Sequence, residues 1–149
     1  MLLAGTLYDP AVAVTKNTTA AQAMTALDTT ALRLTFNAPS SGRVQVRICC
    51  TVHGAVTFPS ILLGVMEGAT VRGRVSPIGA LKNTAVATAH VTQEAVFLVT
   101  GLTPGTDYTF DAAYGVETGV AATGIKYGGP NNTVANDAFG GLVFEIWSP

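Results

Sequence analysis

Short segments in which apolar and polar side chains alternate recur along the chain. Residues 32–36 alternate over five positions and residues 44–48 do so again, with a turn at residues 37–42 between them. Because neighbouring side chains of a strand point to opposite faces, this pattern predicts two strands, which we expect to form a hairpin-like unit. The expected inward side chains are Leu32, Leu34, Phe36, Val44, Val46 and Ile48, and those expected on the other face are Arg33, Gln45 and Arg47.

The same signals predict further strands, each rich in Val, Ile, Leu, Phe or Thr and bounded by Gly, Pro, Asn or Asp. They lie at residues 61–67, 70–76, 93–100, 107–114, 121–127 and 142–147. In the last of them both faces are largely apolar, which favours a central position in a sheet or a subunit contact. Only residues 18–27 have marked helix propensity, and they predict one helical turn or an extended arm.

Many short strands and few helix signals predict an all-β fold, either a sandwich or a barrel. The 149 residues contain no compositional break, so we expect a single domain over residues 21–149. Residues 1–20 are the most separable part of the chain. They are expected to form either an arm that reaches a neighbouring subunit or an edge segment of the nearest sheet.

One turn carries a more specific signal. Residues 101–110, with Pro104 and Gly105 in the turn, resemble the segment before the sixth strand of fibronectin type III modules. In those modules a tyrosine hydroxyl ties the turn to the strand, and the resemblance covers these ten residues only. Pro at one turn position and Gly at the next suit the backbone of such a turn. The motif therefore favours an antiparallel β-sandwich.

Charged residues make up only 11% of the chain, against about 25% in typical soluble domains, while the apolar set reaches 48%. A domain of this size cannot bury that much apolar surface, so we expect self-association to cover part of it. The eight Lys and Arg residues are dispersed and the net charge is -1, which argues against a nucleic-acid partner. No run of 18 apolar residues exists, so no membrane span is expected, and the start has no positively charged signal region.

Candidate chemistry is sparse, and we expect no enzyme, no catalytic residue, no cofactor and no metal site. His53 and His90 are expected in structural or surface roles, since no nucleophile elbow accompanies them. Adjacent Cys49 and Cys50 would point to opposite faces, as one core thiol and one partly covered thiol, with a reactive or metal-binding role as the alternative. Residues 129–137 are expected to form a connecting loop, and calcium binding is the alternative. A glycosidase pair stays open among the solitary carboxylates Glu67, Glu94, Asp107, Asp111, Glu117, Asp137 and Glu145.

Three segments together carry a wider resemblance: residues 35–44, the turn at residues 101–110 and residues 140–147. They resemble small structural proteins of tailed-bacteriophage particles, many of which are similar to trimeric jelly rolls. This resemblance implies a jelly-roll-like sandwich and a homotrimer located in the virion, assembled in the host cytoplasm. The implied function is a capsid decoration (cement) protein that self-associates and stabilises neighbouring subunits of the major capsid protein or another virion protein.

The alternative function is a receptor- or carbohydrate-binding module of a phage fibre or tail. Sugar sites display exposed aromatic side chains on a shallow face. The candidates outside the turn at residues 101–110 are Tyr8, Tyr114, Tyr127 and Trp147. Trp147 lies in an apolar strand, so we expect it to be buried rather than to serve as a sugar platform.

Overall fold

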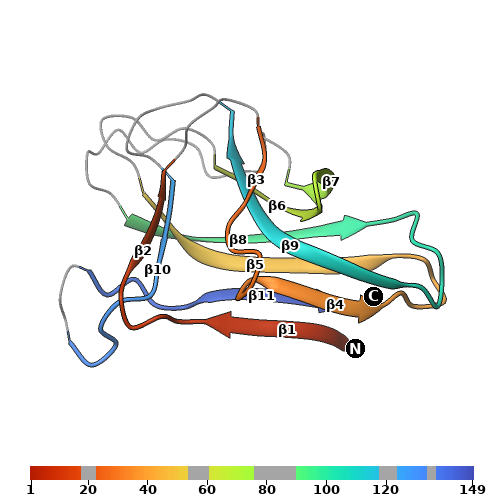
Figure 1. Cartoon of the computed structure of the whole chain (residues 1–149), viewed down its shortest axis with the longest axis horizontal. Coiled ribbons are helices and arrows are strands. Elements are labelled where there is room, and N and C mark those ends of the chain that lie inside the picture. The colour runs from red at the N-terminus through yellow and green to blue at the C-terminus, as the bar shows by residue number, and fades with distance from the viewer. Residues whose placement is uncertain (18–22, 54–60, 76–89, 118–123, 134–136) are drawn as a thin grey trace.

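The computed structural model describes residues 1–17, 23–53, 61–75, 90–117, 124–133 and 137–149, which form two antiparallel sheets (Figure 1). These residues contain no helix, and hence no helix long and apolar enough to cross a membrane. The strands are β1 Leu2–Tyr8, β2 Val14–Asn17, β3 Thr25–Ala26, β4 Arg33–Asn37, β5 Val44–His53, β6 Ile61–Glu67, β7 Thr70–Arg74, β8 His90–Val99, β9 Asp107–Val116, β10 Gly124–Tyr127 and β11 Leu142–Trp147.

The first sheet is built on β5, the long strand that has neighbours on both edges. Along one edge β5 pairs with β8 over ten residues. Along the other edge it pairs first with β11 and then with β10. β1 pairs with β11, and β2 pairs with β10. We therefore count β1 and β2 as one interrupted strand, and β11 and β10 as another. The sheet is therefore four strands wide, in the order β1/β2, β11/β10, β5, β8.

The second sheet follows the same plan. Both β3 and β4 pair with the same strand, β9, which is followed by β6 and then β7. If β1/β2, β3/β4 and β10/β11 each count as one strand, the described residues form eight strands, which we number 1 to 8 in chain order. Their order is 1-8-3-6 in the first sheet and 2-7-4-5 in the second. This arrangement of two four-stranded antiparallel sheets is a jelly roll. The expected sandwich and its jelly-roll-like character are confirmed.

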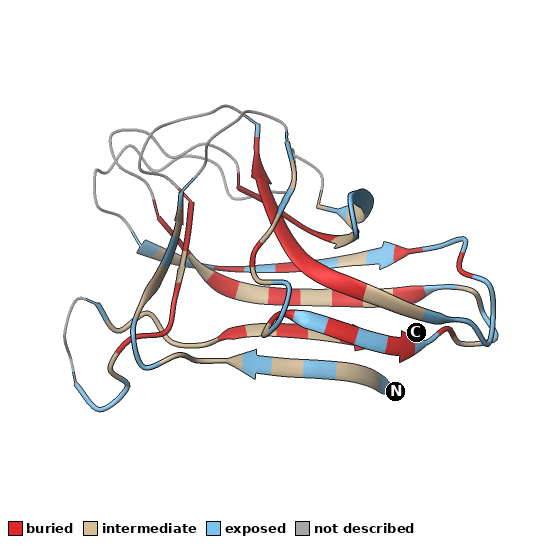
Figure 2. Cartoon of the chain, viewed as in Figure 1, coloured by how far each residue is buried: buried red, intermediate tan, exposed pale blue. Residues whose placement is uncertain are grey.

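The expected hairpin of residues 32–36 and 44–48 is wrong. The first segment, β4, pairs with β9 in the second sheet, whereas the second, β5, lies in the first sheet. The turn between them crosses from one sheet to the other. Alternation does not separate the two cases, because the inner faces of both sheets point into one core. The expected inward side chains are all buried, as Figure 2 shows for the alternating colours of β4 and β5.

The N-terminal strands β1 and β2 form one edge of the first sheet. β1 and β2 pair along nearly their whole lengths with β11 and β10, so the edge-segment alternative for residues 1–20 describes the residues up to Asn17. Residues 18–22 lie outside the described part of the chain. The described remainder of residues 18–27 contains β3 and no helical turn. Pairing of Thr25 and Ala26 with the long central strand β9 outweighs the local helix propensity of these residues.

The core lies between the sheets and is filled from both inner faces. Its largest fully buried side chains include Tyr127, Phe110 and Phe144. β11 lies between β1 and β5, which confirms the central position expected from its two apolar faces. Its inward side chains, Phe144 among them, are fully buried, while the outward Val143, Glu145 and Trp147 are half-buried.

The turn at residues 101–110 is a tyrosine corner. The hydroxyl oxygen of Tyr108 accepts a hydrogen bond of 3.0 Å from the backbone N–H of Thr103. Gly105 has a φ of 76°, a left-handed conformation that glycine adopts without steric cost. The backbone N–H of Gly105 also donates to the carbonyl of Ala38, which joins this corner to the turn between β4 and β5. These hydrogen bonds tie the turn to β9 and to the turn that follows β4.

Residues 23–24 cross the outer surface of the second sheet beside Gly64 and Gly115. A Cβ on Gly115 would lie 2.7 Å from the carbonyl oxygen of Ala23 and 2.8 Å from Sδ of Met24. A Cβ on Gly64 would lie 2.9 Å from Cε of the same Met24 side chain. The missing side chains of Gly64 and Gly115 thus leave the space in which Met24 sits.

Two buried tyrosines of the core differ in the hydrogen bonding of their hydroxyl groups. The Tyr114 hydroxyl donates to the carbonyl oxygen of Asn17 at 2.7 Å. The Tyr127 hydroxyl is buried and has no hydrogen-bond partner among the described residues, and burial raises its pKa to about 12. We expect Tyr127→Phe to raise the free energy of unfolding by about 1 kcal/mol, because it removes an unpaired buried polar group. Tyr114→Phe should lower it by about 1 kcal/mol.

Urea denaturation of the two variants measures this difference directly. The substitutions are chemically identical and each removes one oxygen, so they control for one another. A loss of stability in Tyr127→Phe as large as that in Tyr114→Phe would mean that the Tyr127 hydroxyl is satisfied.

Candidate interaction surface

The outward side chains of β1, β11, β5 and β8 form one continuous surface, which we call the outer face. Strand register arranges it in three rows that run from β1 to β8. The rows are Leu2, Trp147, Gln45 and Leu98, then Gly5, Glu145, Arg47 and Val96, and then Leu7, Val143, Cys49 and Glu94. Arg47 and Glu145 therefore lie in the middle of the outer face, Glu94 lies on its β8 edge, and the large aliphatic side chains lie on its two edge strands, β1 and β8.

The charged groups of the outer face bond one another. Arg47 donates from Nε to Glu94 and from Nη1 to Oε2 of Glu145, the latter at 3.1 Å. The same Glu145 oxygen accepts a hydrogen bond of 3.1 Å from the indole N–H of Trp147. Hydrogen bonds to the two carboxylates raise the pKa of Arg47, first through Glu94 and then through Glu145. A partner that covers this cluster meets charges that are already paired.

The edges of the outer face expose large aliphatic side chains. On β1, Leu2 and Leu7 are 46% and 65% exposed, and on β8, Val96 and Leu98 are 50% and 55% exposed. A shallow depression of about 340 Å³ lies on this face, lined by β1 residues together with Arg47, Val143 and Glu145. Single exposed aliphatic residues are ordinary, but aliphatic residues gathered on one sheet face are typical of an interaction site.

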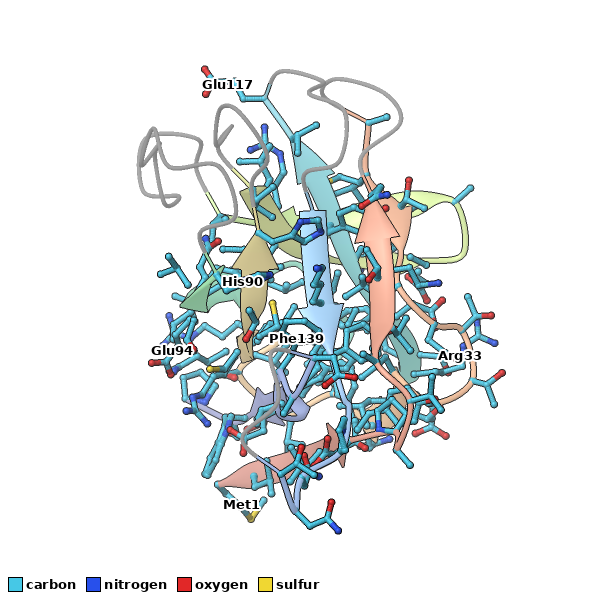
Figure 3. The ribbon with its side chains drawn as sticks, turned by 90° about the vertical axis from the view of Figure 1, so that its left-hand side faces the viewer. Met1, Arg33, His90, Glu94, Glu117 and Phe139 are labelled. Carbon is cyan, nitrogen blue, oxygen red and sulfur yellow. The ribbon has the colours of Figure 1, made fainter. Side chains whose placement is uncertain are left out.

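The two histidines meet at the far end of the first sheet. His53 on β5 is paired with His90 on β8, and their ring centroids are 6.3 Å apart. Lys126 Nζ lies 3.4 Å from His90 Nε2 and 4.9 Å from the centre of the Phe139 ring. The Phe139 ring is also 5.2 Å from that of His90, and both residues are labelled in Figure 3. The neighbours of His90 are therefore a cation, Lys126, and the aromatic ring of the loop residue Phe139.

We expect His90 to make the free energy of unfolding depend on pH. Burial and the charge of Lys126 lower the pKa of its imidazole below the usual value. The unfolded chain therefore binds a proton more readily than the folded chain does, and stability falls as the pH falls through this range. We expect the free energy of unfolding to decrease between about pH 7.5 and about pH 5.5, and to decrease less in His90→Asn. Urea denaturation across this range measures both slopes, and Lys126→Gln should give an intermediate slope.

The cysteines lie as expected, on opposite faces of β5. Cys49 is half-buried in the outer face, Cys50 is buried in the core, and neither forms a disulfide. Burial raises the pKa of both thiols, which favours the unreactive protonated form.

The carboxylates are less solitary than the sequence suggested. Glu94 and Glu145 converge on Arg47, whose guanidinium occupies the space between them. Arg33 holds Asp111 through two hydrogen bonds of 2.7 and 2.8 Å, and the carboxylate is buried. These ion pairs come from residues far apart in sequence, so only strand register reveals them.

The remaining candidates do not converge on a site in the described residues. Residues 134–136 lie outside them, and in the described part of residues 129–137 the Gly129 N–H donates to Pro10, as in a connecting loop. The part of the chain that the structure describes contains no group of three or more His, Cys, Asp or Glu that could hold a metal ion. Tyr114 and Tyr127 lie in the core, and Tyr8 packs on Tyr127 with ring centroids 5.8 Å apart. Trp147, expected to be buried, is half-buried on the outer face.

Comparisons with known proteins add no family to these observations. The protein-family models, the curated proteins and the solved structures give no match to the chain. The outer face is therefore the feature from which a function is best argued.

Proposed function

We propose that this chain is a non-enzymatic structural protein of a tailed-bacteriophage particle. Its role would be that of a capsid decoration protein, which self-associates and holds neighbouring subunits of the major capsid protein together. Homotrimers and a location in the virion, after assembly in the host cytoplasm, belong to the same proposal. The turn-and-strand resemblance suggests this role, and the jelly-roll fold is compatible with it.

The outer face is the observation that carries the proposal. Each exposed aliphatic side chain that a partner covers contributes about 25 cal/mol per Å² of buried apolar area. A partner that covers Arg47, Glu94 and Glu145 would cover charges that already bond one another, so it would create no new unpaired charge. A flat sheet face with aliphatic edges thus suits a protein partner, and the low charge content of the whole chain has the same implication.

The carbohydrate-binding alternative is favoured by one observation, the half-buried position of Trp147 on the outer face. Its neighbours in the strand register, Leu2 and Gln45, leave part of the indole accessible. A sugar would stack on that ring and bond the polar groups nearby. Specific glycan binding that Trp147→Ala abolishes would favour this alternative over capsid decoration.

Binding to capsid shells tests the main proposal. We expect the purified chain to be an oligomer in light scattering and to sediment together with shells made of the major capsid protein. Leu7→Glu should weaken shell binding about tenfold or more, which corresponds to about 1.4 kcal/mol, because it places a charge on an aliphatic edge of the outer face.

Val12→Glu is the matched control for this experiment. Val12 is an exposed aliphatic residue between β1 and β2 and lies outside the rows of the outer face. It should leave shell binding unchanged. A wild-type chain that stays a single copy at micromolar concentration and does not bind shells would refute the proposed function.

A further inference from the structure

The free edge of β8 is unlike that of an ordinary edge strand. β8 spans ten residues and pairs with β5 along its full length, from His90 to Val99, without a register shift. Among the described residues, no backbone hydrogen bond connects its other edge to any segment. With respect to the described residues, this edge presents a row of unpaired N–H and C=O groups beside the exposed Val96 and Leu98.

The other edges carry the features that prevent strand addition. Natural edge strands are kept short, interrupted, bulged or charged. β7 has five residues, a register shift in its pairing with β6, and the charged Arg72 and Arg74. β1 contains a register shift, β2 has four residues and includes Lys16, and β3 and β4 form an interrupted edge.

β8 lacks these protective features. It contains no Pro, no Lys or Arg and no bulge, and Glu94, its one formally charged residue, is held by Arg47. A strand with this sequence and geometry is suited to pair with another strand.

We propose that β8 pairs with β8 of a second copy of this chain, antiparallel and across a two-fold axis. This inference rests on the proposed self-association and adds to the homotrimer a second, two-fold contact between copies. A second copy is the fitting occupant because an isologous contact presents the same exposed aliphatic patch from both sides. Val96 of one copy then meets Val96 of the other.

Side-chain chemistry favours a register centred on Val96 over one centred on Glu94. Centring the two-fold axis on Val96 places this residue opposite itself and places Phe97 opposite the small Ala95. It also places Glu94 opposite Leu98. Centring on Glu94 would place two carboxylates directly opposite one another, which is unfavourable. The Val96 register therefore avoids like charges and matches a large side chain with a small one.

The contact would join two sheets edge to edge. A two-fold axis perpendicular to the sheet places the outer faces of both copies on the same side. Each pair then offers a continuous surface of eight strands, twice the width of the single outer face. This contact would join one trimer, formed through another surface, to a second trimer.

Site-directed cross-linking tests the contact. We expect Val96→Cys, in a Cys49→Ser background, to give a covalent dimer with a short bismaleimide. Cys50 is buried and should not react. Val71→Cys in the same background is the matched control, because Val71 is an edge-strand valine of similar exposure, 44% against 50% for Val96. The control should give no dimer above the level of the background.

A second pair of variants measures the assembly without a chemical reagent. Val96→Lys should halve the particle mass in light scattering, while Val71→Lys should leave it unchanged, and circular dichroism should report folded protein in both. If the wild type self-associates and binds capsid shells but Val96→Cys forms no dimer and Val96→Lys keeps its mass, the β8 contact is wrong and the proposed function stands. If the wild type is a single copy that still binds shells, the β8 contact is wrong and only the self-association part of the function fails.

Discussion

Phe144→Ala is expected to lower the free energy of unfolding by about 3–5 kcal/mol. The Phe144 side chain is fully buried at the centre of the core, on a strand that has neighbours on both sides. Its truncation removes apolar contact area and leaves a cavity that two hydrogen-bonded sheets cannot easily close. In a domain of this size the loss corresponds to a fall in Tm of roughly 10 °C.

Val143→Ala is the control for this prediction, measured in the same urea denaturation series. Val143 is the preceding residue of the same strand but points to the outer face, where it is half-buried. Its truncation should cost about 1 kcal/mol or less. Equal losses in the two variants would contradict the assignment of inward and outward faces on β11.

Gly115→Ala should lower the free energy of unfolding by about 1–3 kcal/mol. The added methyl group would lie 2.7 Å from the carbonyl oxygen of Ala23, and a backbone atom cannot move aside as a flexible side chain does. The segment that crosses the second sheet would have to lift off, together with the Met24 side chain.

Gly5→Ala provides the comparison. Gly5 is also a strand glycine, but a Cβ there would have ordinary contacts, the nearest at 3.4 Å from Glu145 Cγ. We expect its unfolding free energy to stay within about 0.5 kcal/mol of the wild type. Thermal unfolding of both variants separates the steric effect from the general effect of adding a methyl group. An unchanged stability of Gly115→Ala would show that residues 23–24 are not held against the sheet.

Local patterns in the sequence were sufficient to predict the strands from β4 to β11 and the inward faces of β4 and β5, but not β1, β2 and β3 as strands. Alternation identified Leu34 and Val46 as core residues because the side-chain period of a strand is a property of the backbone itself. The tyrosine corner was also predictable, because Thr103 and Tyr108 are close in sequence. Pattern alone failed for the segment joining β4 and β5, since a hairpin and a crossing between sheets bury the same positions.

The features that depend on strand register were not predictable. Arg47 meets Glu94 and Glu145 because β8 and β11 both pair with β5, and nothing near Arg47 in the sequence signals this. The space for Met24 depends on Gly64 and Gly115, which lie on neighbouring strands. Glycine in a strand signals a close approach, but the sequence does not say what approaches. Edge positions likewise follow only from the strand order, so β8 was identified as a free edge by the structure.

The position of β5 between β8 and β11 also has a consequence for the rate of folding. Arg47 on β5 and Glu145 on β11 are 98 positions apart in the chain, and β8 is the nearest segment in sequence that pairs with β5. Loop closure over such separations is entropically costly, so folding of this kind takes milliseconds to seconds. During synthesis, the part of β5 that pairs with β11 stays without this neighbour until β11 has left the ribosome. Strand edges that are unpaired during folding favour aggregation.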